Sequence, residues 1–461
     1  MMLELQHIVN VLNDWIWGAP LLILLVLVGV YLTIRTRALQ FRYLIYAHKL
    51  AFSRHDDKAE GDISHFQALM TALAATIGIG SITGVATAIA IGGLGALFWM
   101  WIAALFGMAT KYGEAILAIK YRIADESGEM CGGPMYYLEK GMKAKWLGVA
   151  FAFLAAVTAL GTGNMVQANS VALAVQDLFH VPPLWSGLVL MVLVGIALIG
   201  GIKSIGKVAG ILVPAMATFY ILGGVIIIIL KITAVPAAFA LIFKSAFSGQ
   251  SAVGGFAGAT IMTAIQLGVS RGVFSSEAGL GSSPIAAAAA KTDTPGRQAL
   301  VSMCSVFITT GIVCTITGLV IVLSGVFGEI GADGKLLDGS ALALRAFDKI
   351  IPYGGLIVTI ALIPFAYSTI LGWAYYGEKC VEYLFGIRAT KAYLIIFTLL
   401  VVPGSILSLQ LVWGFANMMN GLMAFPNLIG LFVLAGVISK ETRFFERLLK
   451  KEKQEKLLNK Q

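Results

Sequence analysis

Charged residues are scarce in this chain, and their scarcity excludes a large soluble protein. Asp, Glu, Lys and Arg make up 12% of the 461 residues, whereas 58% of the residues are hydrophobic and the mean hydropathy is +0.87. Soluble domains carry about 25% charged residues. The composition therefore predicts an integral membrane protein.

Cysteine and histidine are rare as well, which argues against metal and redox chemistry. The four cysteines have no paired spacing, so we expect neither disulfides nor a structural zinc site. His48, His55 and His65 share one charged loop without ligand spacing, and a solvated loop is the preferred interpretation. No apolar run contains a histidine and no Walker-type loop occurs, so we expect no enzyme, no ATP-driven pump and no cofactor.

Long apolar runs dominate what is present. A helix of about 20 apolar residues crosses a bilayer, and the sequence predicts eleven such spans. They cover about 13–34, 66–92, 95–121, 147–177, 184–202, 207–231, 254–281, 298–325, 352–378, 390–410 and 413–438.

The basic residues predict the orientation of these spans. Most of the 33 Lys and Arg residues fall in alternate loops and in the tail 440–461, which places the N-terminus outside and the C-terminus in the cytoplasm. The basic tail is expected near anionic lipid. This bias accounts for the net charge of +9 without a nucleic-acid partner.

Two apolar runs are interrupted by glycines, at 78–84 and at 268–272. Unpaired backbone survives at membrane depth only where it is buried in protein or lines a cavity. Paired interruptions in two halves of one chain point to a substrate site near the bilayer midplane. The alternative is a pair of flexible or tightly packed helices.

The spans divide into two halves if the first is set aside. Segment 1–65 holds an extra helix and a basic inner loop, 66–231 and 254–438 hold five spans each, and 439–461 forms the tail. Because five is odd, the second half enters the membrane from the opposite side, which predicts inverted repeats. The connections 232–253 and 326–351 are expected outside, the latter as a solvated lid or turn.

Neither predicted interruption contains Asp or Glu, so a zwitterion would be held by backbone and hydroxyl groups. Amides at a half-helix N-terminus suit a carboxylate, and unwound carbonyls suit a hard cation. Thr369 and Trp373 share a helical face at i and i+4, although hydroxyls such as that of Ser368 also bond to their own helix. Gln167 either joins helices or touches substrate, as do Asn164 and Asn169.

Charged residues within spans are expected to be functional or paired. Lys111 and Glu114, at i and i+3, are interpreted as a structural ion pair. Arg271 and Glu277 flank the second interruption, where they would form an inner gate or cap the local break.

Several motifs resemble the alanine/glycine:cation symporter family, also called sodium:alanine symporters. Segment 92–107 reads GGLGALFWMWIAALFG and is similar to the signature of that family. Further similarity covers most of the chain from about 61 to 440. It occurs in GGPMYYLEKG (132–141), IKSIGKV (202–208), RGVFSSEAGLGSSPI (271–285), AAAAKT (287–292) and STILGWAYYGE (368–378).

The resemblance implies an all-α inner-membrane transporter with leucine-transporter-like inverted five-helix repeats. It also implies symport of a small neutral amino acid, alanine or glycine first, with Na⁺. Proton coupling, another substrate such as serine or glutamine, and a nontransporting amino-acid sensor are the alternatives, and the oligomeric state is left open.

The resemblance also implies site residues. The substrate carboxylate would meet the amides around Ile79, Gly80 and Ser81. Thr369 and Trp373 would face its amino group and side chain. Gln167, Ile265 and Gly268 would line the pocket. Na⁺ would lie between carbonyls of Ala74 and Ile77 and the hydroxyls of Ser368 and Thr369.

The chain departs from the family at the first interruption, where GIGS (78–81) replaces the usual GTGN. Backbone donors survive this change, whereas a threonine hydroxyl and an asparagine amide are lost. Ser276 likewise stands where the family usually has Asn. We expect these differences to affect the choice of substrate or ion and not the fold.

Overall fold

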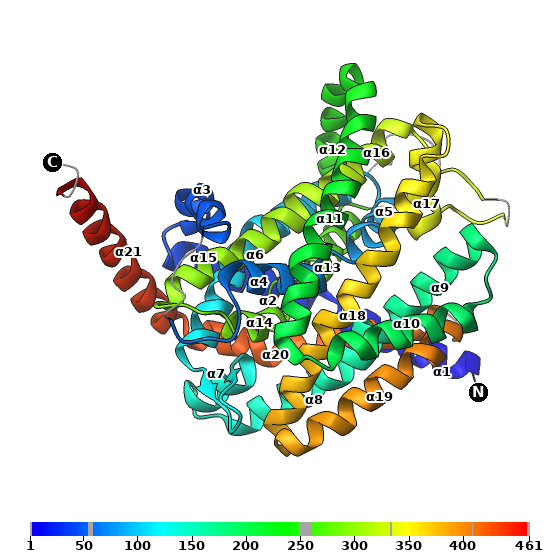
Figure 1. Cartoon of the computed structure of the whole chain (residues 1–461). Helices are drawn as coiled ribbons and strands as arrows, with labels where there is room; N and C mark the ends of the chain where they lie inside the picture. The colour runs from blue at the N-terminus through cyan, green and yellow to red at the C-terminus, as the bar shows by residue number, and fades with distance from the viewer. Residues whose placement is uncertain (1, 54–58, 249–259, 332–333, 408, 459–461) are drawn as a thin grey trace.

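The computed structural model describes residues 2–53, 59–248, 260–331, 334–407 and 409–458, which form mainly helices (Figure 1). In this part of the chain, eight helical segments are long and apolar enough to cross a membrane, and a pair of helices bent by 67° adds a ninth. These lengths identify a multi-pass membrane protein. The described residues also include a short antiparallel hairpin of β1 (Ile123–Ala124) and β2 (Met130–Cys131).

The N-terminal segment and the first half account for six predicted spans. The first span comprises the end of α1 (Met2–Ile16) and α2 (Ala19–Arg35). The π-helical turn η2 (Ala159–Met165) joins α8 and α9 into one span. The helices of the first half are α4 (His65–Thr76), α5 (Thr83–Gly92), α6 (Gly95–Lys120), α8 (Lys145–Thr158), α9 (Val166–Phe179), α10 (Pro183–Leu198) and α11 (Gly201–Leu230).

The second half accounts for the other five spans. The π-helical turn η4 (Phe307–Cys314) joins α15 and α16. Two of the eleven predicted spans, 184–202 and 254–281, correspond to shorter helices, since α10 and α13 (Ile261–Ser276) have 16 residues each. Residues 254–259 of the second of these spans lie outside the described residues. The helices of this half are α13 (Ile261–Ser276), α14 (Ser283–Ala288), α15 (Pro295–Val306), α16 (Thr315–Ser324), α18 (Gly355–Phe385), α19 (Ile387–Ile406) and α20 (Leu409–Val433).

The first four spans of one half pack on their counterparts in the other half. The second part of the first bent helix, α5, packs on α13, and its first part, α4, packs on α14. In the same way α6 contacts α15, α8 and α9 contact α18, and α10 contacts α19 (Figure 1). An inverted repeat requires this crosswise pairing of two broken helices. The division at 66–231 and 254–438 stays a prediction.

Two connections expected as outer loops contain helices. The short turn η3 (Ile232–Ala234) and α12 (Val235–Ser248) occupy the first connection, and α12 packs on α6. The second contains α17 (Gly339–Ile350), which buries Leu342 and Phe347 against α5 and α18. The prediction of a solvated lid or turn at 326–351 was therefore wrong for α17, because its apolar residues recur at helical spacing. Asp333 of this connection lies outside the described residues.

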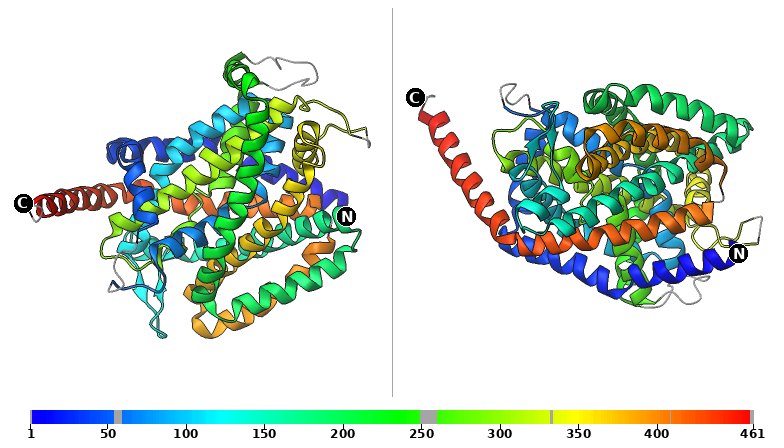
Figure 2. Two further views of the ribbon diagram at one scale, coloured as in Figure 1. Left: turned by 45° about the horizontal axis from the view of Figure 1, so that its top comes forward. Right: turned by 90° about the horizontal axis from the view of Figure 1, so that it is seen from below.

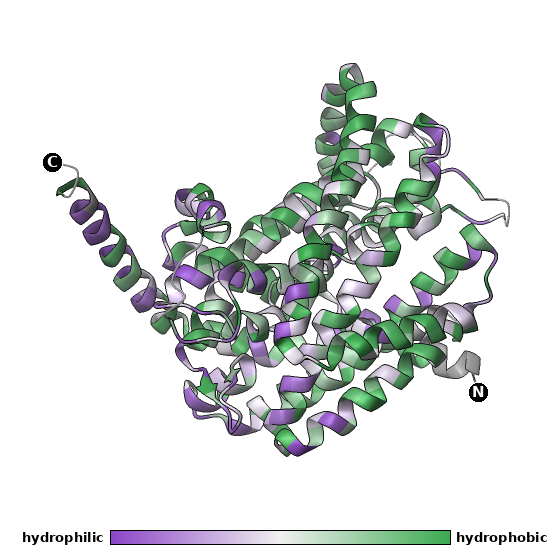
Figure 3. Ribbon diagram, in the orientation of Figure 1, coloured by the Kyte–Doolittle hydropathy of each residue, from purple (hydrophilic) through white to green (hydrophobic). Residues whose placement is uncertain are grey.

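Hydrophilic residues gather at two opposite ends of the helical body (Figure 3). One end holds α3 (Leu39–Ala51), α7 (Pro134–Lys140) and α21 (Ala435–Leu458), and α17 lies at the other. This arrangement is the one expected if the basic loops share one membrane face.

The basic tail forms α21, which projects from the body (Figure 2). Ion pairs join it to the rest of the chain, with Lys120 Nζ 2.6 Å from Glu441 Oε1 and Arg42 Nη2 2.5 Å from Glu446 Oε1. Its predicted position beside anionic lipid stays a prediction.

Candidate functional site

The first interruption lies where the sequence predicts it. A capping box of Ser64 and Gln67 starts α4, which ends at Thr76. Gly78 is then extended, with φ −127°, and the single 3₁₀ turn η1 (Ile79–Ser81) leads into α5. A Cβ on Gly78 would lie 2.6 Å from Thr369 Oγ1, so a glycine allows α18 to approach this backbone.

The second interruption lies elsewhere than predicted. Helix α13 continues through 268–272 to Ser276, so the prediction of a break there was wrong. The physical reason is close packing, because a Cβ on Gly268 would lie 2.5 Å from the Ala96 carbonyl oxygen of α6. The chain breaks at 277–282 instead, where Glu277, Gly279 and Gly281 have φ of 55°, 93° and 82°.

Two buried charges on α6 bind the backbone at this second break. Lys111 Nζ donates to the Ser276 carbonyl at 2.9 Å, at the C-terminal end of α13. Glu114 Oε1 accepts from the amides of Gly279 and Gly281, both at 3.1 Å, just before α14. Each charge thus neutralises the helix end of opposite sign. This arrangement takes the place of the predicted ion pair between Lys111 and Glu114.

The interrupted segments enclose a small cavity between α4, η1, α9, α13, α18 and α20. Its volume of about 20 Å³ holds roughly one water molecule. The lining residues are Ala75, Thr76, Gly78, Ile79, Gly80, Thr162, Gln167, Phe274, Glu277, Leu280, Thr369, Trp373 and Asn420.

Five of the predicted substrate residues line this cavity, and three do not. Ser81 is buried behind it, where its Oγ lies 3.0 Å from Ser275 Oγ and its amide donates to the Gly78 carbonyl. Gly268 faces α6, and Ile265 lies three residues nearer the start of α13. The five lining residues are Ile79, Gly80, Gln167, Thr369 and Trp373.

Sequence reasoning missed several lining residues. Phe274 and Glu277 lie within the motif at 271–285, which could have marked them. Thr162 lies in the π-helical turn η2 and Asn420 on α20, and neither carries a local signal.

Two lining side chains carry acceptor oxygens that have no hydrogen-bond partner among the described residues. Gln167 Nε2 donates to the Thr162 carbonyl at 3.1 Å, whereas Gln167 Oε1 has no hydrogen-bond partner among the described residues. Asn420 Oδ1 also has none there. Buried acceptors of this kind favour a ligand that donates hydrogen bonds.

The predicted cation residues converge at the end of α4. Ser368 Oγ lies 3.3 Å, and Thr369 Oγ1 3.0 Å, from the Ala74 carbonyl oxygen. Both hydroxyls are also 2.9 Å from the Phe365 carbonyl of their own helix, so each has an alternative acceptor to the Ala74 carbonyl. Ile77, one residue past α4, is fully buried. Three oxygens therefore meet where the helix unwinds.

A larger cavity of about 810 Å³ lies beyond the first, next to α17. Phe274 lines the small cavity and Trp413 the large one, and their ring centroids are 5.7 Å apart. Each space is thus lined by one ring of this aromatic pair. Arg271 lines the large cavity together with Asp338 of the predicted outer connection, and its role as an inner gate or a cap of the break stays a prediction. The large cavity is named the outer vestibule below.

On the other side, residues 60–63 pair with residues 289–292, an arrangement named the inner strap below. The Asp62 amide donates to Ala289 O at 2.8 Å, and the Lys291 amide donates to Ile63 O at 2.8 Å. The Arg122 guanidinium donates to carbonyls on both strands of the strap, at 2.8 Å to Ala290 and 2.9 Å to Glu60. The strap thus ties the start of α4 to the end of α14.

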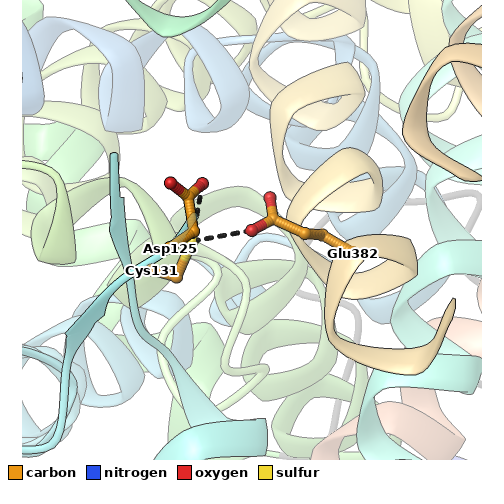
Figure 4. Close-up of side chains that lie close together, drawn as sticks. All are labelled: Asp125, Cys131 and Glu382. Carbon is orange, nitrogen blue, oxygen red and sulfur yellow. Dashed lines mark hydrogen bonds between the residues drawn. The ribbon is translucent and has the colours of Figure 1, made fainter. Parts of the chain in front are cut away.

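A buried ionic cluster connects the hairpin to α18 (Figure 4). Asp125, Cys131 and Glu382 have ligand atoms within 4.8 Å of one another, the spacing of a possible metal site in the described residues. However, Lys379 Nζ lies 3.5 Å from Asp125 Oδ2 and 2.9 Å from Glu382 Oε2, so the chain supplies its own cation. Burial raises the pKa of the Cys131 thiol, which donates to Glu382 Oε1 at 3.1 Å.

The pKa of Asp125 shows how firmly this cluster is held. Burial alone would raise it, but hydrogen bonds from Ser127 and the Glu129 amide, together with the Lys379 charge, lower the pKa to about 2. Of the histidines, His65 contacts Gln298 and His48 contacts the Leu44 carbonyl, while His55 lies outside the described residues. The four cysteines are free and buried.

Comparisons with known proteins agree with this architecture. A sequence profile described as "Sodium:alanine symporter family" matches residues 2–459. "Sodium/alanine symporter AgcS" of Methanococcus maripaludis is 56% identical over 98% of this chain and 99% of its own length. "Probable sodium/glutamine symporter GlnT" of Bacillus subtilis is 36% identical over 96% of this chain and 91% of its own.

Solved structures confirm the predicted leucine-transporter-like fold. The structure of MhsT in complex with L-phenylalanine has a TM-score of 0.56 at 14% identity, over 84% of this chain and 99% of that one. A Na⁺-coupled sialic acid symporter has a TM-score of 0.52 at 13% identity, over 94% and 86% of the two chains.

Proposed function

The chain belongs to the sodium:alanine symporter family, and from that premise we propose that it imports alanine or glycine together with Na⁺ by alternating access. Members of this family are transporters and not enzymes, so binding and conformational change are the steps to explain. The observation that carries the proposal is the convergence of two hydroxyls on one carbonyl at the first break.

Na⁺ would be bound by neutral oxygen atoms at this point. The Ala74 carbonyl, Ser368 Oγ and Thr369 Oγ1 supply three ligands, and the Ile77 carbonyl is the fourth in the proposal. Hard cations prefer such oxygens. These groups do not titrate near neutral pH, which supports Na⁺ over H⁺ at this position.

The substrate carboxylate would meet the backbone of η1. The amides of Ile79 and Gly80 begin this turn and precede its first hydrogen bond, whereas the Ser81 amide already donates to Gly78 at 3.1 Å. Two amides thus remain for the carboxylate, one fewer than the sequence suggests. Ile79 and Trp373 restrict the side chain of the substrate, which favours alanine or glycine.

Transport would require the small cavity to widen, because about 20 Å³ is too little for an amino acid. The inner strap closes one side, and on the other the site and the outer vestibule are each lined by one ring of the Phe274–Trp413 pair. Parting of the aromatic rings would admit substrate and Na⁺, and release of the strap would deliver them inside.

A proton-coupled symporter is the second candidate. Glu277 favours it, since a carboxylate at the cavity could carry a proton where hydroxyls cannot. The name of GlnT keeps glutamine among the substrates to be tested. A nontransporting sensor would bind the same ligands without flux.

Thr369→Ala tests the ion assignment in the purified protein reconstituted in liposomes. Loss of one oxygen ligand is expected to raise the Na⁺ concentration for half-maximal alanine uptake by about tenfold or more. Thr359→Ala is the matched control, because Thr359 lies on the same helix and its hydroxyl donates, within the described part of the chain, to the Gly355 carbonyl of that helix. Equal Na⁺ dependence in Thr369→Ala and the control would refute the assignment.

A further inference from the structure

Among the described residues that line the small cavity, Glu277 is the one with a carboxylate side chain, and its backbone conformation is unusual. It follows α13 directly with φ of 55°, a conformation that non-glycine residues seldom adopt. Its side chain is 2% exposed. Backbone strain of this kind persists only where surrounding contacts fix it, and it is concentrated at functional sites.

Contacts orient this carboxylate toward the cavity wall. Ser282 Oγ donates to Glu277 Oε2 at 2.6 Å. Trp373, itself a lining residue, lies close enough to this carboxylate to interact with it. Glu277 therefore joins the second break to the side chain that restricts the pocket.

The neighbouring charges leave Glu277 without a full counter-ion. Glu114 Oε1 accepts hydrogen bonds from the amides of Gly279 and Gly281, and Lys111 Nζ donates to the Ser276 carbonyl. With all three side chains ionised, Lys111, Glu114 and Glu277 together carry one net negative charge. An uncompensated charge at membrane depth is costly, so the cluster favours a ligand that brings a positive charge.

The other polar groups of the cavity point to the same ligand chemistry. The free oxygens of Gln167 and Asn420 are acceptors, and both side chains are at least nine-tenths buried. A primary ammonium group supplies three N–H donors and one positive charge. A hydroxyl in its place would supply one donor and no charge.

We propose that Glu277 is the counter-ion of the substrate's ammonium group and, with Gln167 and Asn420, selects α-amino acids over their α-hydroxy analogues. This assignment rests on the proposed function, because it needs an amino acid at the site. The assignment adds Glu277 to the residues of the pocket, whereas the sequence pattern places Glu277 beside a break.

Equilibrium binding to the full-length purified protein in saturating Na⁺ tests this assignment. L-Alanine is compared with L-lactate, which replaces the ammonium group by a hydroxyl. Glu277→Gln keeps the shape of the side chain and is expected to weaken alanine binding by about 10–100-fold while leaving lactate unchanged. Glu329→Gln is the matched control on the outer connection, where Glu329 pairs with Arg345 and Lys349, and it should bind alanine like the native protein.

The outcomes separate the assignment from the proposed function. If the Glu277→Gln protein is folded and binds alanine as tightly as the native protein, the assignment is wrong, but the proposal of alanine transport is unaffected. Native protein that binds lactate as well as alanine overturns it too, even if Glu277→Gln does not fold. If serine or glutamine binds in place of alanine and glycine and still requires Glu277, the proposed choice of substrate fails while the assignment holds. Absence of binding by every amino acid refutes both.

Discussion

Gly78 shows how one residue fixes the geometry of the site. Its missing side chain lets Thr369 Oγ1 and Gln167 Oε1 come close, since a Cβ there would lie 2.6 Å and 3.7 Å from these atoms. Thr369 belongs to both the substrate cavity and the group of cation oxygens. Any displacement of α18 at this point would therefore disturb both ligands.

Gly78→Ala is expected to reduce Na⁺-driven alanine uptake by about 100-fold, because displacements of about 1 Å at a positioned site have effects of that size. Gly84→Ala is the matched control, since a Cβ on Gly84 meets nothing within 4 Å among the described residues. Uptake is measured in liposomes containing equal amounts of folded protein. Similar uptake by the two variants would contradict the role given to Gly78.

The residues of the site differ in how far the sequence reveals them. Thr369 and Trp373 could be predicted, because one helical face and one motif carry both. Asn420 could not, because it lies on α20 and only the fold brings it to the first break. The sequence places Glu277 beside a break. Its position in the cavity wall depends on the left-handed backbone conformation that follows α13.

At the scale of elements, the two broken helices differ in what breaks them. The first break coincides with its glycines, at 78–84. In the second, Gly268 and Gly272 serve the close contact of α13 with α6, and Gly279 and Gly281 make the turn. Glycines needed for packing and glycines needed for a turn look alike in a sequence. The existence of the second break could therefore be predicted, whereas its position could not.

Arg122 stabilises the inner strap, and removal of its side chain should loosen the start of α4 and the end of α14. Arg122→Ala loses hydrogen bonds to Ala288, Ala290 and Glu60 and is expected to speed amide exchange at 60–63 and 289–292 by about tenfold or more. Arg42→Ala is the control, because Arg42 makes its ion pair with Glu446 of α21. An unchanged rate of amide exchange in the Arg122→Ala variant would show that the inner strap is stable without the Arg122 side chain.

The buried ionic cluster at the hairpin predicts how the stability of the protein depends on pH. Because the pKa of Asp125 is lowered to about 2, its contribution to stability is present above the unfolded-state pKa of about 3.9 and is lost as the pH falls through about 2. The difference in thermal midpoint between native protein and Asp125→Asn should therefore stay constant from about pH 8 to pH 5. A difference that shrinks within this range would mean that Asp125 is not held in its ionised form.

At the scale of the whole molecule, the order of the spans was predictable because each is a long apolar run. The crosswise packing of α4 and α5 against α14 and α13 follows from five spans in each half. Helices α12 and α17 were missed, since connections were judged by charge and length and not by periodicity. The membrane orientation, with the N-terminus outside and the C-terminus in the cytoplasm, stays a prediction from the basic loops.

The central claim is that one closed site between two broken helices couples alanine to Na⁺. Uptake of radiolabelled alanine into proteoliposomes tests it most directly, with an inward Na⁺ gradient, an inward H⁺ gradient or neither. The account predicts accumulation above the external concentration with the Na⁺ gradient alone. Accumulation driven by H⁺ without Na⁺, or equilibration that ignores both gradients, would contradict it.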